Sequence, residues 1–165
     1  MGCGKTTVGK NLAKIAKYVF TDTDEMIEKI YGKTIKDIFA ESGEEVFRQM
    51  ETEVLKKLIS DKSKNLVIST GGGMPIKFEN RKLLEKLGTV VYLKASPETI
   101  YEHVKHDTKR PLLQCENPQQ KIREMLAQRN PVYESVADII INVDNLKQSE
   151  IADRLKRSCH VNKRI

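Results

Sequence analysis

Short apolar runs alternate along the chain with segments in which apolar residues recur every three or four positions. The clearest runs, at residues 66–69, 89–93 and 139–142, have the length and composition of buried strands. A shorter strand is predicted at 19–20 and runs into the polar residues 21–24. Because strands that alternate with helices form a parallel sheet covered on both faces, the pattern predicts a three-layer α/β fold.

The helices are predicted from the spacing of apolar residues between these runs. A first helix carries Val8, Leu12 and Ile15, and Thr34 is in place to cap another. The remaining helices are expected at residues 24–31, 34–41, 44–59, up to Lys86, after Pro97, up to Arg129 just before Asn130, and at the C-terminal end.

The periodicity lapses at about residues 105–117, a polar segment that contains Arg110. A basic segment without regular spacing is typical of either an active-site lid or an ordinary surface loop. As a lid it would place Arg110 over a transferring phosphoryl group.

The chain opens on the back half of a phosphate-binding loop of pattern GxxxxGK[ST]. In such a loop, successive backbone N–H groups face phosphate oxygens, the lysine reaches the outer phosphates and the threonine hydroxyl binds Mg²⁺. A glycine-rich helix cap and an N-terminal lipid-attachment pattern are the alternatives that this stretch leaves open. The residues predicted to bind nucleotide are Gly2, Cys3, Gly4, Lys5, Thr6 and Thr7.

Composition narrows the possible functions. The 165 residues, 39% of them hydrophobic, suit one domain spanning 1–165, and no apolar run is long enough for a membrane span. We therefore expect a cytoplasmic protein without a membrane partner. The net charge of +6 comes from scattered lysines with few aromatic residues, which does not favour nucleic acid as a partner.

Several polar residues follow the predicted strands, where parallel sheets bind their ligands. Asp22 and Asp24 come after the first strand, with Asp22 expected near Mg²⁺ and Asp24 either on a substrate hydroxyl or capping a helix. Gly71, Gly72 and Gly73 follow the next strand and allow the backbone to approach a ligand closely.

Two arginines have the chemistry to recognise a carboxylate. The planar forks of Arg48 and Arg129 match that group, although each could equally form a surface ion pair.

Taken together, the ordered motifs resemble the shikimate kinase family over nearly the whole chain. The matching stretches are residues 2–7, 22–24, 38–39, 47–48 with Glu51, 69–73, 110–113 and 129–133. The resemblance implies a P-loop kinase that phosphorylates the 3-hydroxyl of shikimate with ATP and Mg²⁺, a step towards chorismate and the aromatic amino acids.

The resemblance also implies roles for individual residues. Those matching Lys5 and Arg110 would act on phosphate, those matching Thr6 and Asp22 would hold Mg²⁺, and the one matching Asp24 would contact the shikimate hydroxyls and accept the proton. The residues matching Arg48, Arg129 and the triple glycine at 71–73 would bind shikimate. We expect a monomer.

The adenine contact departs from the family pattern. Many relatives have an arginine on the helix before the lid, where this chain offers His103 or Lys105. The loop after the last strand is the other candidate, with Lys147 or Gln148 as its polar member; we assign Gln148.

The family's parallel sheet has the order 2-3-1-4-5, and its first, central strand has no counterpart in this sequence. About ten unpaired buried backbone groups, at about 1–3 kcal/mol each, would exceed the stability of a typical domain. We therefore expect about ten further residues upstream, with Met1 internal to the P-loop. The remaining functional alternatives are a gluconate or nucleotide kinase and a non-catalytic binding relative.

Overall fold

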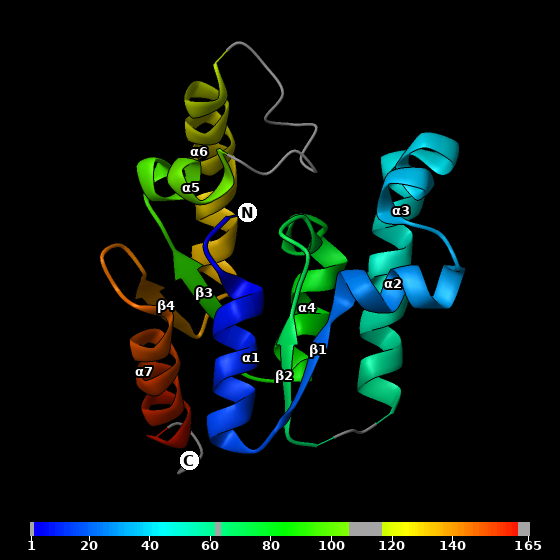
Figure 1. Cartoon of the computed structure of the whole chain (residues 1–165). Coiled ribbons are helices and arrows are strands. Elements are labelled where there is room, and N and C mark those ends of the chain that lie inside the picture. Colours follow the sequence, from blue (N-terminus) through cyan, green and yellow to red (C-terminus); the bar gives the residue numbers. More distant parts are fainter. Residues whose placement is uncertain (1, 62–63, 106–116, 162–165) are drawn as a thin grey trace.

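The computed structural model describes residues 2–61, 64–105 and 117–161 (Figure 1). The expected lid segment lies almost wholly outside these residues, and so does Arg110. No helix among the described residues is long and apolar enough to cross a membrane.

Helices and strands alternate as the sequence pattern predicts. The elements are α1 (Lys5–Ala16), β1 (Val19–Asp22), α2 (Thr23–Tyr31), α3 (Ile35–Ser60), β2 (Leu66–Ser69), the 3₁₀ turn η1 (Met74–Ile76), α4 (Phe78–Leu87), β3 (Val91–Lys94), α5 (Pro97–Val104), α6 (Pro118–Val136), β4 (Ile139–Asn142) and α7 (Gln148–Val161).

Local residue types explain where four of the helices begin and where α2 ends. The side chains of Asp22, Thr34, Ser96 and Asn117 accept hydrogen bonds from backbone N–H groups in the first turns of α2, α3, α5 and α6. Gly32 ends α2 in the left-handed conformation, at a φ of 65°.

The break predicted between the helices at 34–41 and 44–59 is confirmed: within α3, Gly43 has a φ of 78° and a ψ of 176°, which are not helical and divide it into two helical segments. Two other predicted boundaries need correction. The strand expected at 89–93 begins later, at Val91. The helix expected to end at Arg129 continues through Pro131 to Val136, because the buried Val136 packs against Met74 and Leu84 and offsets the hydrogen bond that proline cannot make.

The described strands form two parallel pairs. In β1–β2 the register sets Asp22 opposite Ser69, and in β3–β4 it sets Lys94 opposite Asn142. The carboxyl ends within each pair therefore coincide, as expected for ligand binding in an α/β sheet.

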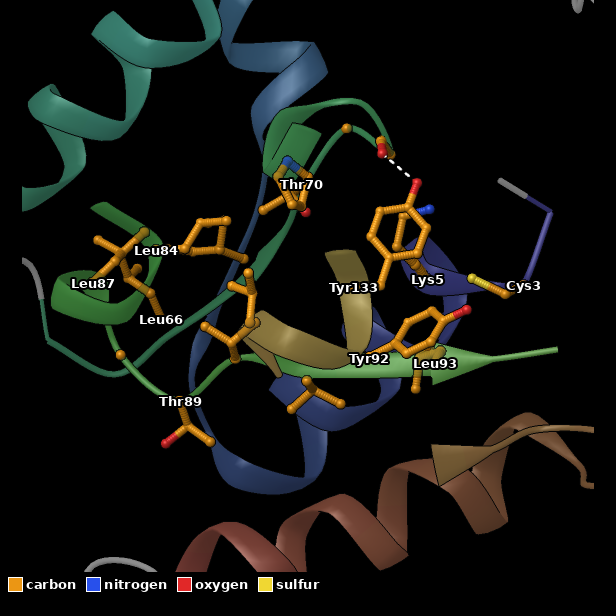
Figure 2. Close-up of a pocket in the computed structure, with 18 residues that line it drawn as sticks. Cys3, Lys5, Leu66, Thr70, Leu84, Leu87, Thr89, Tyr92, Leu93 and Tyr133 are labelled. Carbon is orange, nitrogen blue, oxygen red and sulfur yellow. Dashed lines mark hydrogen bonds between the residues drawn. The ribbon is translucent and has the colours of Figure 1, made fainter. Parts of the chain in front are cut away.

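A cavity of about 220 Å³ lies between the two pairs (Figure 2). Apolar side chains from β2, α4 and β3 line much of the cavity. Lys5, Tyr133 and the loop of three glycines at residues 71–73, called the glycine loop below, lie at the end of the cavity near the carboxyl ends of the strands. Among the described residues, β2 pairs only with β1 and β3 only with β4, so no continuous sheet is observed.

Three apolar clusters hold the helices in place. One joins α1, α5, α6 and α7 around β3 and contains Val8, Leu93, Ile122 and Leu155. A second joins α2 to α3, and a third joins α3, η1, α4 and α6. Figure 1 shows α1 beside α7 and, in this view, between the β3–β4 pair and the β1–β2 pair, with α2 and α3 at the right.

Candidate active site

The opening turn, residues 2–4 directly before α1, has the backbone geometry of an anion-binding loop. Gly2 and Gly4 have φ values of 68° and 80°, a region that favours glycine, and Gly4 directly precedes α1. Lys5, Thr6 and Thr7 form the first turn of α1, where free N–H groups and the helix dipole favour an anion.

Neighbouring elements hold this turn in position. His103 donates from Nδ1 to the carbonyl oxygen of Gly2 at 2.7 Å, and a Cβ on Gly2 would lie 2.8 Å from Val104. The side chain of Cys3 is buried in the apolar cluster around α1, so only its backbone is available to a ligand. Gln148 lies beside the turn, with Nε2 3.7 Å from the position of a Cβ on Gly4.

Thr6 and Asp22, the two predicted metal ligands, are brought together by α1 and β1. Thr6 Oγ1 donates to Asp22 Oδ2 at 3.3 Å, while Asp22 Oδ1 accepts from the N–H of Asp24 at 3.0 Å and caps α2. No group of three or more metal-binding side chains occurs in the described part of the chain. A hydroxyl and a carboxylate nevertheless fit Mg²⁺, which commonly keeps several waters and takes its remaining ligands from substrate phosphates.

Asp24 is available to a substrate because Asp22, rather than Asp24, caps the helix. Its Oδ1 is buried and has no hydrogen-bond partner in the part of the chain that the structure describes. Burial and the neighbouring Asp22 raise the pKa of the Asp24 carboxyl, while the charges of Lys5 and Arg48 work against that rise. The carboxyl therefore lies within the electrostatic reach of both the opening turn and Arg48.

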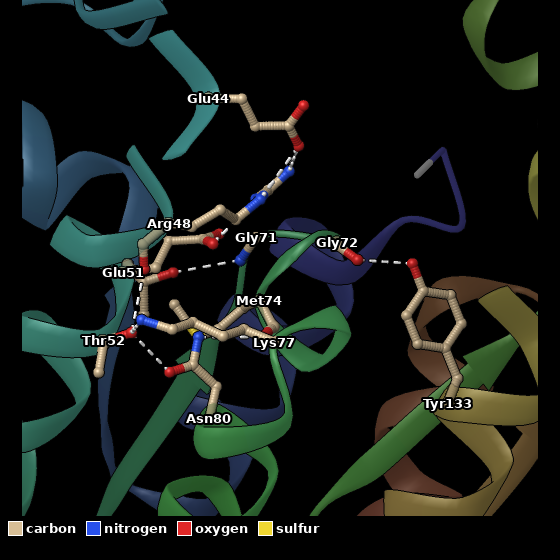
Figure 3. Close-up of polar contacts among 11 residues, drawn as sticks. Glu44, Arg48, Glu51, Thr52, Gly71, Gly72, Met74, Lys77, Asn80 and Tyr133 are labelled. Carbon is tan, nitrogen blue, oxygen red and sulfur yellow. Dashed lines mark hydrogen bonds and ion pairs between the residues drawn. The ribbon is translucent and has the colours of Figure 1, made fainter. Parts of the chain in front are cut away.

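Arg48 lies against the glycine loop and is oriented by two carboxylates (Figure 3). Its Nη1 donates to Glu51 at 2.8 Å and its Nη2 donates to Glu44 at 2.6 Å. A Cβ on Gly73 would overlap the guanidinium, which explains why a residue without a side chain is needed there.

Glu51 is a site residue to which the sequence reasoning gave no role. Its side chain is fully buried, with 0% exposed, and its second oxygen, Oε1, has no hydrogen-bond partner within residues 2–61, 64–105 and 117–161. Burial raises the pKa of the Glu51 carboxyl, and the hydrogen bond from Arg48 opposes this rise. The signal in the sequence was its spacing of three residues from Arg48, which puts both side chains on one face of a helix.

Arg129 is half-buried on α6. It lies one turn before Tyr133, whose hydroxyl donates to the carbonyl oxygen of Gly72 at 2.5 Å. The charges of Arg129 and Arg48 both act on the Tyr133 hydroxyl, so both arginines lie within its electrostatic reach. That the two arginines bind one carboxylate stays a prediction.

Comparison with known proteins assigns the family. A model of the shikimate kinase family matches residues 1–160. A shikimate kinase of Thermodesulfovibrio yellowstonii is 46% identical over 155 residues, which are 94% of this chain and 88% of that protein. A shikimate kinase of Neisseria meningitidis is 45% identical over 157 residues, covering 95% of this chain and 91% of the relative.

Solved structures agree. The shikimate kinase of Acinetobacter baumannii, determined in complex with shikimate, superposes with a TM-score of 0.91 at 41% identity, covering 100% of this chain and 91% of that one. The enzyme of Aquifex aeolicus superposes with a TM-score of 0.84 at 33% identity, covering 99% of this chain and 94% of the other.

Proposed function

Because this chain belongs to the shikimate kinase family, we propose that it transfers the γ-phosphoryl group of ATP to the 3-hydroxyl of shikimate, using the residues around its opening turn. The observation that carries the assignment of roles is the position of Asp24, which lies within the fields of both Lys5 and Arg48 and is buried beside the glycine loop. The phosphates of ATP, the base Asp24 and the hydroxyl of shikimate would then lie together at the carboxyl ends of the strands.

On the donor side, the N–H groups at the start of α1 bind the phosphates, and Lys5 neutralises charge that develops on the transferring group. Gln148 contacts the nucleotide from the loop after β4. Arg110 closes over the phosphoryl group from the segment outside the described residues. Thr6 and Asp22 would hold Mg²⁺, which supplies charge neutralisation and orients the phosphates when bound.

On the acceptor side, Asp24 Oδ1 accepts the hydroxyl proton, a role supported by its burial and by the absence of a protein partner. Arg48 and Arg129 grip the carboxylate of shikimate through their planar forks. The glycine loop at 71–73 admits the ring because it has no side chains. Most of the rate enhancement in such a reaction comes from positioning and charge neutralisation.

A coupled assay with several acceptors tests the proposal. We expect phosphorylation of shikimate and none of gluconate or nucleoside monophosphates. The ring of shikimate holds its carboxylate and its hydroxyls at a fixed separation that can match the arginines and Asp24, whereas gluconate is an open flexible chain and nucleoside monophosphates carry no carboxylate. Arg48→Lys keeps the charge but loses the fork, so it should raise the KM for shikimate, whereas Arg123→Lys at an exposed pair with Glu98 should not. Equal turnover of another acceptor, or binding of shikimate without turnover, would favour the alternative functions.

We further propose that the complete sheet has the family's order 2-3-1-4-5. In this numbering, family strands 2, 3, 4 and 5 are β1, β2, β3 and β4 of this chain, and family strand 1 is the central strand between β2 and β3. The support is the cavity at that place and the two strand edges that face it.

A further inference from the structure

Tyr133 connects the helix that carries Arg129 to the glycine loop. The residues are four apart on α6, so both side chains project from one face of the helix. The Tyr133 hydroxyl donates to the carbonyl oxygen of Gly72 at 2.5 Å (Figure 3). Its ring packs against that of Tyr92 in β3, with the ring centroids 5.2 Å apart, and this contact restrains the Tyr133 side chain.

The loop held by this bond touches the other half of the site. Gly71 lies against Asp24, and Gly73 lies against the guanidinium of Arg48. A shift of the Gly72 carbonyl would therefore move the backbone on which both side chains rest. Through this one carbonyl, Tyr133 ties α6 to the elements that carry Asp24 and Arg48.

The surroundings of the hydroxyl agree with a place between the two arginines. Burial raises the pKa of Tyr133, and the positive charges of Arg129 and Arg48 both oppose that rise. The hydroxyl thus stays protonated at neutral pH and serves as a hydrogen-bond donor to Gly72.

We propose that Tyr133 is a positioning residue for carboxylate recognition, and that its hydrogen bond to Gly72 sets the separation between Arg129 and Arg48. This inference rests on the proposed function, because it assumes that both arginines bind one carboxylate. Tyr133 itself need not touch the substrate.

The test compares Tyr133→Phe with Tyr92→Phe. Both variants lose only a hydroxyl, but the Tyr92 hydroxyl donates to Asn130 at 2.7 Å and does not contact the glycine loop. Leaving the part-buried Gly72 carbonyl without its donor predicts that kcat/KM for shikimate falls about ten- to a hundredfold in Tyr133→Phe, mainly through KM, while the KM for ATP stays unchanged. Tyr92→Phe should stay close to the wild type.

A shikimate analogue with a hydroxymethyl group in place of the carboxylate separates positioning from general damage. In the wild type and in Tyr92→Phe, loss of the carboxylate should sharply reduce kcat/KM. In Tyr133→Phe this further loss should be much smaller, because the arginines no longer act together on that group. Equal losses in all three proteins would overturn the inference.

Hydrogen exchange gives a readout that does not depend on turnover. The amides of residues 70–74 and of Ile76 should exchange faster in Tyr133→Phe than in Tyr92→Phe. If the wild type does not phosphorylate shikimate, the proposed function fails, yet faster exchange would still support the tie between Tyr133 and Gly72. Exchange and shikimate KM equal to those of Tyr92→Phe would overturn the inference, whatever the activity of the wild type.

Discussion

Asp24 and Gly71 lie so close together that position 71 has no room for a side chain. A Cβ there would lie 2.8 Å from Asp24 Oδ1 and 2.9 Å from Glu51 Oε1, and both of these oxygens are buried without hydrogen-bond partners among the described residues. The glycine therefore does more than permit a turn, because it leaves space for two buried carboxyl groups.

Gly71→Ala should displace Asp24 and disable transfer. We expect kcat to fall by about a hundredfold, because a base moved by about 1 Å loses most of its advantage. Gly32→Ala is the comparison: no atom lies within 4 Å of its added Cβ, but its φ of 65° makes the residue strained. That variant should lose stability and keep its turnover, and a Gly71→Ala enzyme of normal kcat would contradict the geometry.

Asp24→Asn should lower kcat by about 10²- to 10⁴-fold, the usual contribution of a general base. Since burial raises the pKa of Asp24, the acidic limb of the wild-type kcat/KM profile should lie above the ordinary aspartate pKa of 3.8. The profile of kcat/KM from about pH 3 to about pH 9, a range chosen to extend below the ordinary aspartate pKa, measures this. A limb at or below the ordinary value would refute the assignment.

Asp24→Asn should also change how the stability of the protein depends on pH. A raised folded pKa means that the native state binds the proton more tightly, so this contribution to stability is present below the unfolded pKa and is lost as pH rises through the folded one. Asp24→Asn, which carries no charge, should therefore gain stability relative to the wild type as pH rises. Urea midpoints at several pH values would show the gain, and a widening loss would contradict it.

Thr6→Val should weaken the binding of Mg²⁺, because it removes the hydroxyl that lies 3.3 Å from Asp22. We expect the Mg²⁺ concentration for half-maximal rate to rise by about tenfold or more, since each good metal ligand contributes on the order of 1–2 kcal/mol. Thr6→Ser keeps the hydroxyl and should restore near-normal behaviour. Equal Mg²⁺ dependence in the valine and serine variants would argue against a ligand role.

Thr52→Val should destabilise the support beneath the glycine loop. Thr52 and Asn80 are fully buried; Thr52 donates to Asn80 Oδ1 at 2.8 Å, and Asn80 donates to the carbonyl oxygen of Met74 at 3.0 Å (Figure 3). Valine matches the shape but leaves Asn80 Oδ1 without this donor, so the free energy of unfolding should fall by about 1–3 kcal/mol.

Urea denaturation at equilibrium measures this change, with Thr52→Ser as the control because it retains the hydroxyl. The valine variant should have a lower midpoint and an unchanged slope, and the serine variant should lose less. Matching midpoints for the two variants would show that the hydroxyl contributes nothing.

Local spacing carried much of the prediction. The alternation of apolar runs located β2 and β4 at their observed bounds, and the opening Gly-Lys-Thr identified the start of a phosphate-binding helix. These features depend on neighbours within a few residues, which the order of the chain displays directly. The continuation of α6 through Pro131 was missed because the packing of Val136 against distant elements outweighs a local breaker.

The sequence by itself determined the chemistry available to this protein: a phosphate-binding turn, carboxylates after a strand, arginine forks and a loop of glycines. Only the tertiary structure decided which of these groups contact one another. In it, Asp22 rather than Asp24 caps α2, Glu51 accepts a hydrogen bond that orients Arg48, and Tyr133 donates to Gly72, which lies 61 positions away in the sequence. Such pairings arise when helices and strands pack around apolar clusters, and residue spacing carries no record of which distant groups that packing brings into contact.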